Sequence, residues 1–512
     1  ESGEGDNAQQ DDENVDENGN AELSDEANTL DDLSYDAYSN ETYTPDDLSY
    51  DAYSNETCTP GQTQHNFEQS MKDLKDEDAG EHVYHTLAKP VLENIIVPFQ
   101  TVEKIWNTHN EKRPLKDHQV EIHTEAVNDL TAFQREITPT VNHMVQVFQM
   151  KQAADADKRT EVAKTGVLDC IKMIDYRWSE DIFLKNETHA DGKNHGIVMF
   201  LDWSGSMGGI IEDTVKQLLI LVEFCRKVGI PYDVYSFSSM CYSENVDEYG
   251  YPQFDSNTQW WTQERDSDIN PHPFSLFQLL SSDMNSTQHK VAIKNLWILS
   301  RSMCYSYDRR LPCPQSLEMG STPLNEAIIC ALDMVPQFQK KHSVQICNTV
   351  FLTDGEGHSV GLGFRGYQRH NSKSFLRDSK TRAVYSVGSG YTGETGTLLQ
   401  LLKDRTGATI IGIRLHDSRS INNYVRYRLR NTTEEQFKAM DSQFKKMKFV
   451  TVDTDGYDEM FLVQGNVKVQ TDAMEGLDED ASFTKIKNAF MRGNNTKKAS
   501  RVIAGRIVDL IA

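Results

Sequence analysis

Apolar runs and stretches of helical periodicity alternate through the second half of the chain. The clearest run, residues 197–201, has five consecutive apolar residues, which predicts a strand buried on both faces. The apolar positions that follow are spaced as on one helix face and predict a helix over 209–227, closed by Gly229. Further strands are predicted at 230–237, 344–352 and 409–415, and further helices at 290–303, 324–335 and 398–403.

This alternation predicts an α/β fold in which helices cover both faces of a mostly parallel sheet. Pro336 is expected to end the helix that starts at residue 324, because proline lacks the backbone donor and clashes with the preceding turn. Near the C-terminus, residues 448–452 and 459–463 predict one more strand pair. Residues 499–512 predict an amphipathic helix.

The segment before the sheet has a helical pattern instead. Val141, Met144, Val145 and Phe148 fall on one face of a helix. Prolines at 90, 98, 114 and 139 are expected to divide this segment into several helices.

Charge separates the N-terminal end from the rest of the chain. Residues 1–60 contain 19 acidic and no basic residues, so most of the net charge of −26 lies there. This composition predicts disorder. Residues 31–45 recur almost unchanged as 46–60. The repeat is interpreted as a tandem duplication in a tolerant tail, with a repeated acidic-aromatic docking peptide as the alternative.

Composition and periodicity together predict four regions. They are a disordered acidic tail (1–80), a helical accessory region with a connector (81–190), an α/β domain (191–470) with insertions at 240–317 and 359–395, and a C-terminal linker and helix (471–512).

Eight cysteines without a CxxC pair indicate reduced thiols and a cytoplasmic protein, not a disulfide framework. The sequence has no run of 18 uncharged apolar residues and no secretory leader, so we expect no membrane span.

Oxygen-bearing side chains follow three of the predicted elements. Asp202, Ser204 and Ser206 come directly after the first strand, and Asp354 follows the strand ending at residue 352. Thr322 stands just before a predicted helix. The carboxyl ends of parallel strands meet at one edge of a sheet, where ligands bind. Two carboxylates and three hydroxyls predict a Mg²⁺ site with one position open, with Mn²⁺ or Ca²⁺ as alternatives.

This pattern resembles the metal-ion-dependent adhesion site of von Willebrand factor A (VWA) domains. Asp202-x-Ser204-x-Ser206, the Thr322 loop and Asp354 occur in the family's order. The resemblance implies a VWA-type, Rossmann-like fold. It also implies that the hydroxyls approach the ion directly, that Asp354 does so through water, and that an acidic residue of a partner fills the open position.

A narrower resemblance covers residues 140–512. An acidic segment, then helices, then residues 150–169 and the domain with the metal site are similar to the CobT-type subunit of cobaltochelatase. The match is closer to CobT-like proteins of tailed phages related to T4, in which a lead like residues 191–196 enters the strand with its DWSGSM end. The resemblance implies a subunit that works with an AAA+ ATPase of the MoxR/CobS type, in a homo- or hetero-oligomeric ring, with the chelation chemistry elsewhere.

We therefore expect a Mg²⁺-dependent adaptor of a cobaltochelatase-like or remodelling complex that is not catalytic by itself. It would reside in the cytoplasm, that of the host if phage-encoded. A relative of CobT need not take part in cobalamin biosynthesis. The alternative is a phage-encoded, metal-dependent interaction or virion-associated protein without an ATPase partner.

Three other signals carry less weight. Residues 361–366 match GxGxxG, but no helix pattern starts there, so a dinucleotide site is not expected. The chain has neither a P-loop nor an HExxH motif. The alternating basic run 425–430 is interpreted as a solvated face. The preferred alternative is that it binds the chain's own acidic tail; RNA and DNA were the other partners considered, and we do not expect nucleic acid.

Overall fold

The computed structural model describes residues 82–159, 161–163, 170–178, 186–188, 194–245, 252–255, 257–265, 268–304, 311–354, 357–361, 374–387, 391–416, 433–447, 449–452 and 456–464. All belong to one compact unit, Asp76–Ala512. The acidic tail with its repeat, the basic run 425–430, most of the GxGxxG stretch and the predicted helix 499–512 lie outside the described residues.

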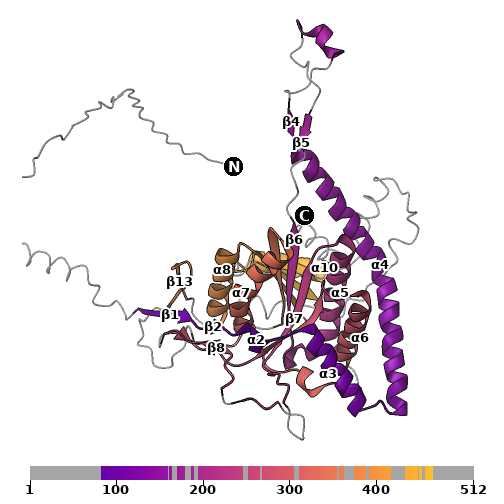
Figure 1. Ribbon diagram of the computed structural model, residues 1–512, viewed down its shortest axis with the longest axis vertical. Helices are drawn as coiled ribbons and strands as arrows, with labels where there is room; N and C mark the ends of the chain where they lie inside the picture. Colours follow the sequence, from indigo (N-terminus) through magenta and orange to yellow (C-terminus); the bar gives the residue numbers. More distant parts are fainter. Residues whose placement is uncertain are drawn as a thin grey trace, which may run out of the picture. The chain divides into compact units, whose positions relative to one another are not determined.

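A central eight-stranded sheet organises this unit (Figure 1). Its strands lie side by side in the order β15-β16-β14-β11-β6-β7-β10-β3. β10 is antiparallel to β7 and β15 to β16, while the other neighbouring pairs are parallel. The strands are β3 (Ile96–Val97), β6 (His195–Asp202), β7 (Tyr232–Ser238), β10 (Ser275–Ser281), β11 (Ile346–Leu352), β14 (Thr409–His416), β15 (Phe449–Val452) and β16 (Glu459–Gln464).

The path of the chain through this sheet decides where a ligand can bind. Numbered from β6, the six main strands β6, β7, β10, β11, β14 and β16 lie in the doubly wound order 3-2-1-4-5-6. The direction of winding reverses between β6 and β11. In such sheets ligands bind outside the carboxyl ends of the strands at this switch point. Leu201 pairs with Leu352, so the residues after both strands meet at the same edge.

Helices cover both faces of the sheet, as predicted. Met199 and Leu201 on β6 share one core with α3, α4, α5 and α6, whereas Val198 and Phe200 share a second core with α7 and α8. The helix α10 packs against β15. The helices are α3 (Phe99–Lys112), α4 (Asp117–Arg159), α5 (Ile211–Val228), α6 (Ser286–Met303), α7 (Leu324–His342), α8 (Tyr391–Thr406) and α10 (Glu434–Met447).

Smaller elements surround this framework. A second sheet has the order β13-β12-β1-β9, and two strand pairs, β2 with β8 and β4 with β5, stand apart from it. Their bounds are β1 (Val83–Leu87), β2 (Lys89–Pro90), β4 (Glu161–Ala163), β5 (Asn186–Thr188), β8 (Trp261–Thr262), β9 (Asp268–Ile269), β12 (Ser374–Arg377) and β13 (Val384–Ser386). The short helices are α2 (Leu92–Ile95), η1 (Lys172–Asp175), η2 (Gly205–Gly209) and η3 (Gln315–Leu317).

Each strand and helix predicted between residues 196 and 463 is present, but two regional predictions need correction. The stretch 240–317 is not only an insertion, because it supplies β10 to the central sheet and α6 to its cover. The accessory stretch 81–190 is not purely helical and does not stand apart. It supplies β1 and β3, and its helices α3 and α4 share one core with α5 and α6.

Two predicted helix breaks are wrong. α7 continues through Pro336 to His342, and α4 continues through Pro139. In both helices the apolar stripe is buried beyond the proline, at Phe338 in α7 and at Val141 in α4. Burial of these side chains offsets the backbone hydrogen bond that each proline removes.

Two further expectations concern the thiols and the membrane. The seven cysteines among the described residues are all free thiols. None of the described helices combines the length and the apolar composition needed to cross a membrane.

Candidate metal centre

The site begins where β6 ends. Asp202 is the last residue of the strand and is fully buried, and η2 starts three residues later. Five buried apolar residues before Asp202 hold the strand in the centre of the sheet, so its carboxylate lies at a fixed place at the switch point. Ser204 is also buried, while Ser206 is exposed. The three side chains therefore lead from the core to the surface.

Hydrogen bonds connect these residues to the end of β11. The Thr353 hydroxyl donates to Asp202 Oδ2 over 2.7 Å, and the Ser206 hydroxyl donates to Asp354 Oδ1 over 3.0 Å. The hydroxyl oxygens of Ser204 and Ser206 are 3.0 Å apart. Two strands that are 151 residues apart in the chain thus contribute to one cluster of oxygens.

The third predicted loop reaches the same edge through its backbone. The Gly205 N–H donates to the Gly320 carbonyl over 2.9 Å, and the Gly320 N–H donates to the Trp203 carbonyl over 3.2 Å. Thr322 follows just before α7 and is buried, with 8% of its surface exposed. Among the described residues, no hydrogen bond joins the Thr322 hydroxyl to the other four predicted ligands.

Close approach at this loop requires a glycine. A Cβ at Gly320 would stand 2.6 Å from Ser239 Oγ and 2.7 Å from Ser238 Oγ, closer than real Cβ contacts. The absence of a side chain lets the loop lie directly against the end of β7. The Ser321 N–H then donates to Ser239 Oγ over 2.8 Å. This packing fixes the position of Thr322 next to the end of β6.

Burial makes the Asp202 carboxyl an unusually weak acid. Its pKa is raised from an ordinary 3.8 to about 7, mainly by desolvation and also by the neighbouring charge of Asp354. Hydrogen bonds from Thr353 and Ser204 act in the opposite direction. The carboxylate therefore favours any cation that offsets its charge.

The second carboxylate oxygen of Asp202 tests whether the site fits a cation. Asp202 Oδ1 is buried and has no hydrogen-bond partner among the described residues. A buried oxygen without a partner is costly, and a bound cation would remove that cost. The donor set is oxygen only, which matches the preference of Mg²⁺.

The described residues contain no group of three His, Cys, Asp or Glu side chains placed to hold a metal. A cation here would therefore rest on two carboxylates, on hydroxyls and on water. Mg²⁺ keeps several waters in many protein sites and tolerates this arrangement. The exposed Ser206 and the half-buried Asp354 leave the outer side of the cluster accessible to another molecule.

Sequence reasoning placed Thr353 in the motif Thr353-Asp354-Gly355 but gave it no role at the site. The signal was present, because Thr353 directly precedes Asp354 at the same strand end. It also missed the network that supports residues 357–361 next to Thr322. Asn325 Nδ2 donates to the His358 carbonyl over 2.7 Å, and Glu394 accepts hydrogen bonds from Ser359 and Val360.

The chain was also compared with known proteins. No protein-family model matches it, and no curated protein matches it. Among solved structures it is similar to the pilus adhesin SpaC from Lactobacillus rhamnosus GG in its open conformation, at 11% identity and a TM-score of 0.25. That alignment covers 63% of this chain and 30% of the adhesin.

A second similar structure is the vWF domain of the type V pili tip protein Mfa5 from Porphyromonas gingivalis. The identity is 11% and the TM-score 0.26, over 63% of this chain and 98% of that domain. Because both TM-scores are low, the fold is assigned from the strand order of the central sheet itself. It is the mixed α/β fold expected of a VWA-type domain. The relationship to CobT stays a prediction.

Proposed function

We propose that this chain is a metal-dependent protein-interaction subunit. In this proposal Asp202, Ser204, Ser206, Thr322 and Asp354 hold Mg²⁺, and an acidic residue of a partner completes the coordination of the ion. The observation that carries the proposal is Asp202 Oδ1, a buried carboxylate oxygen without a partner among the described residues. It stands at the inner end of an oxygen cluster that reaches the surface at Ser206.

The residues of the chain would have different roles at such a site. Asp202 would supply a charge that burial keeps away from competing water, and the Thr353 hydroxyl holds its carboxylate in one orientation. Asp354 adds a second charge nearer the surface. The ion would supply the positive charge that a partner's carboxylate binds. Mn²⁺ and Ca²⁺ are the alternatives, and Ca²⁺ needs more oxygen ligands.

For the partner, the proposal follows the resemblance to CobT-type subunits: an AAA+ ATPase of the MoxR/CobS type, within a cobaltochelatase-like or remodelling complex. The chain then acts as an adaptor that couples movements of the ATPase to a client. The second candidate is an interaction or virion-associated protein without an ATPase. The adhesin and pili-tip roles printed for the two similar structures are theirs alone.

The metal part is tested by titrating Mg²⁺ into the full chain and measuring the heat of binding. Asp202→Asn and Ser204→Ala should each weaken binding by more than tenfold, since even outer-shell partners contribute 10–100-fold. Ser300→Ala is the matched control, because Ser300 is equally buried but lies in α6 and donates to Trp297. Unchanged Mg²⁺ affinity in Asp202→Asn would rule the site out.

The partner part is tested by co-purification with the candidate ATPase, with and without EDTA. Capture should require Mg²⁺ and should be lost in Asp202→Ala. Capture that survives both EDTA and the substitution contradicts docking through the metal. A stable assembly that contains no ATPase and does not respond to nucleotide supports the second candidate instead.

A further inference from the structure

A polar cavity lies at the edge of the central sheet opposite the candidate metal centre. β7 begins there at Tyr232, whereas Asp202 pairs with Phe237 near the other end of the same strand. The cavity has a volume of about 300 Å³. One water molecule needs only about 10–15 Å³ of such space, so a small molecule fits. The basal cavity, as it is called from here on, is lined among others by Arg226, Tyr232, Ser282, His289 and His342.

Three of the lining side chains form a chain of hydrogen bonds. Arg226 Nη1 lies 2.7 Å from His289 Nδ1, and His289 Nε2 lies 2.7 Å from the Tyr232 hydroxyl. Because a guanidinium can only donate, Nδ1 accepts and the neutral ring donates from Nε2 to the Tyr232 oxygen. The hydrogen of the Tyr232 hydroxyl is then left over, and the described residues offer it no acceptor. Tyr232 is 1% exposed, so an acceptor atom of a ligand would remove the cost of this unused donor.

Further donors lie at the ends of α5 and β10. Arg226 Nη2 donates to Ser286 Oγ over 3.2 Å, and within the part of the chain that the structure describes no carboxylate pairs with the Arg226 guanidinium. Ser282 Oγ accepts from the Tyr232 backbone N–H over 3.2 Å, which leaves the Ser282 hydroxyl hydrogen available. A guanidinium and two hydroxyls can therefore donate to one ligand.

The remaining charges at the basal cavity largely cancel. Asp283, the carboxylate among its lining residues, forms an ion pair with Lys341. The C-terminal ends of α5 and α7 also lie there, and each has basic residues in its last turn that offset the negative end of the helix dipole. The charge of Arg226 is left, so the basal cavity favours an anion.

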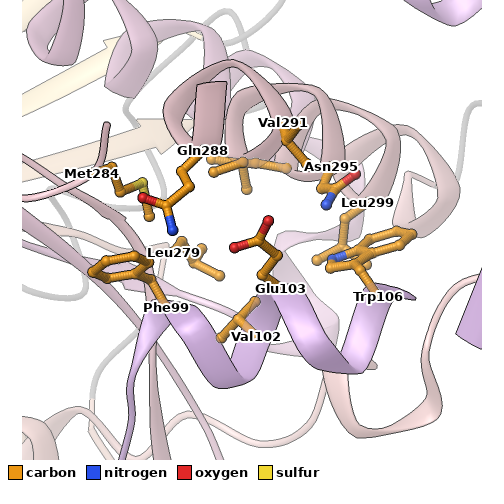
Figure 2. A pocket seen from close by; sticks show the side chains of 12 residues that line it. Phe99, Val102, Glu103, Trp106, Leu279, Met284, Gln288, Val291, Asn295 and Leu299 are labelled. Atoms are coloured by element: carbon orange, nitrogen blue, oxygen red, sulfur yellow. The ribbon is translucent and has the colours of Figure 1, made fainter. Parts of the chain in front are cut away.

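The cavity between α3 and α6 shows what a less suitable site looks like. Its volume is about 30 Å³, which is room for two or three waters at about 10–15 Å³ each. Figure 2 shows the Glu103 carboxylate pointing into its middle, among apolar side chains that include Phe99, Trp106 and Leu299. Both its size and the charge of Glu103 exclude an anionic ligand there.

We propose that the basal cavity binds a small molecule through a phosphate or carboxylate group. This oxyanion accepts hydrogen bonds from the Arg226 guanidinium and from the hydroxyls of Tyr232 and Ser282. Arginine forms paired hydrogen bonds with both kinds of group. His342 Nε2, which is buried and has no hydrogen-bond partner among the described residues, is a further polar contact for the bound molecule. The basal cavity shares no residue with the candidate metal centre, so this inference does not depend on the proposed function.

Burial also keeps the two inner members of the chain in the state that binding requires. It raises the pKa of the Tyr232 hydroxyl, which therefore retains its hydrogen at neutral pH. Burial and the charge of Arg226 lower the pKa of His289 to about 4, so the ring stays neutral and can accept from Arg226. Binding of an oxyanion should therefore be available at neutral pH.

Calorimetric titration of inorganic phosphate into the full chain tests the proposal, at constant ionic strength and in buffer freed of divalent metals. The wild type should bind one phosphate. Arg226→Gln and Tyr232→Phe should each weaken binding about tenfold or more, because hydrogen bonds to a charged group are among the stronger ones. A wild type that gives no saturable heat with either phosphate or acetate would overturn the proposal.

Two control variants make the same chemical change outside the basal cavity. Lys227→Gln removes a positive charge next to Arg226 in the chain, from a side chain that donates to Asn142 Oδ1. Tyr235→Phe removes a hydroxyl from the same strand, one that donates to Asp233 Oδ2. Both should bind phosphate like the wild type. Equal losses in Arg226→Gln and Lys227→Gln would show that only net charge matters, which contradicts a built site.

Two more variants guard against misfolding and against binding elsewhere. Ser282 is exposed, so Ser282→Ala should fold and should still weaken phosphate binding about threefold or more. Asp202→Asn should bind phosphate like the wild type. A thermal melt establishes that each variant is folded. If phosphate binding were lost in Asp202→Asn and kept in the Arg226, Tyr232 and Ser282 variants, the anion would lie at the metal centre and the proposal would be wrong.

Comparison of phosphate with acetate identifies the group that the basal cavity prefers. Tighter binding of phosphate assigns a phosphate-bearing molecule, and tighter binding of acetate assigns a carboxylate. Either anion should displace the other, and binding of both should weaken in Arg226→Gln. Two anions that bind without competing would contradict a single oxyanion site.

Discussion

At the residue scale, the hydrogen bond from Thr353 to Asp202 sets the orientation of the carboxylate at the candidate site. The sequence indicated Asp202 because a carboxylate directly follows a run of apolar residues. It did not indicate that Thr353 would donate to that carboxylate, because the two residues are 151 positions apart. Only the pairing of β6 with β11 brings them together. A residue that orients a metal ligand is therefore harder to predict from the sequence than the ligand itself.

Thr353→Val should weaken Mg²⁺ binding about tenfold while leaving the fold intact. Valine keeps the shape of the side chain but removes the hydroxyl that orients Asp202. Calorimetric titration of Mg²⁺ measures the change. Thr349→Val is the control, since Thr349 is buried in the middle of β11, the strand that ends just before Thr353. Equal losses in the two variants would mean that the Thr353 hydroxyl has no special role.

His289 is a second residue whose chemistry the tertiary structure decides. It is 1% exposed, with Nδ1 2.7 Å from Arg226 Nη1 and Nε2 2.7 Å from the Tyr232 hydroxyl. The arginine can only donate, so Nδ1 accepts and the neutral ring donates from Nε2. Burial and the charge of Arg226 lower the pKa of His289 from 6.5 to about 4.

This shift predicts a pH dependence of stability. Between pH 6.5 and 4 the unfolded chain binds a proton at His289 that the folded chain does not, so the contribution is full above pH 6.5 and is lost as the pH falls toward 4. The loss should be about 3 kcal/mol, at about 1.4 kcal/mol for each pKa unit between 6.5 and 4. Denaturant unfolding of wild type and His289→Gln measures it by difference.

The variant should be less sensitive to acid across that window, even if it is less stable at neutral pH. His118→Gln, on the exposed side of α4, is the control and should keep the wild-type pH dependence. If His289→Gln kept the wild-type slope as well, His289 would not be the titrating group.

At the scale of elements, the presence of helices such as α5, α6 and α7 and their periodic faces were predictable, but the effect of proline was not. Pro139 lies inside α4, and its missing N–H leaves the Arg135 carbonyl without its usual helical donor. Leu130, Phe133 and Ile137 before the proline and Val141 after it are all buried. The helix continues because its face packs on α5 and α6, which a local rule cannot detect.

Pro139→Ala should raise the free energy of unfolding by about 1–3 kcal/mol. Alanine restores the helical hydrogen bond, and the greater freedom of the unfolded chain offsets part of the gain. Urea unfolding measures the difference. Pro98→Ala is the control, since Pro98 is exposed at the N-cap of α3, where the donor is not needed. A stability gain equal in both variants would contradict this account.

At the scale of the whole molecule, the arrangement of strands is the decisive fact. The switch point between β6 and β11 brings Asp202 and Asp354 to one edge, and the backbone of residues 203–205 brings the Thr322 loop to it. β10, predicted within an insertion, completes the third position of the sheet.

The sequence by itself determined the fold class and the candidate ligands, because burial imposes a periodicity that each strand and helix carries locally. Asp202, Ser204 and Ser206 stand next to one another in the chain and needed no long-range information. The tertiary structure alone decided the role of Thr353, the continuity of α4 through Pro139, and the membership of β10 in the sheet. These depend on contacts between residues far apart in the chain, and such contacts follow from packing, which no local pattern contains.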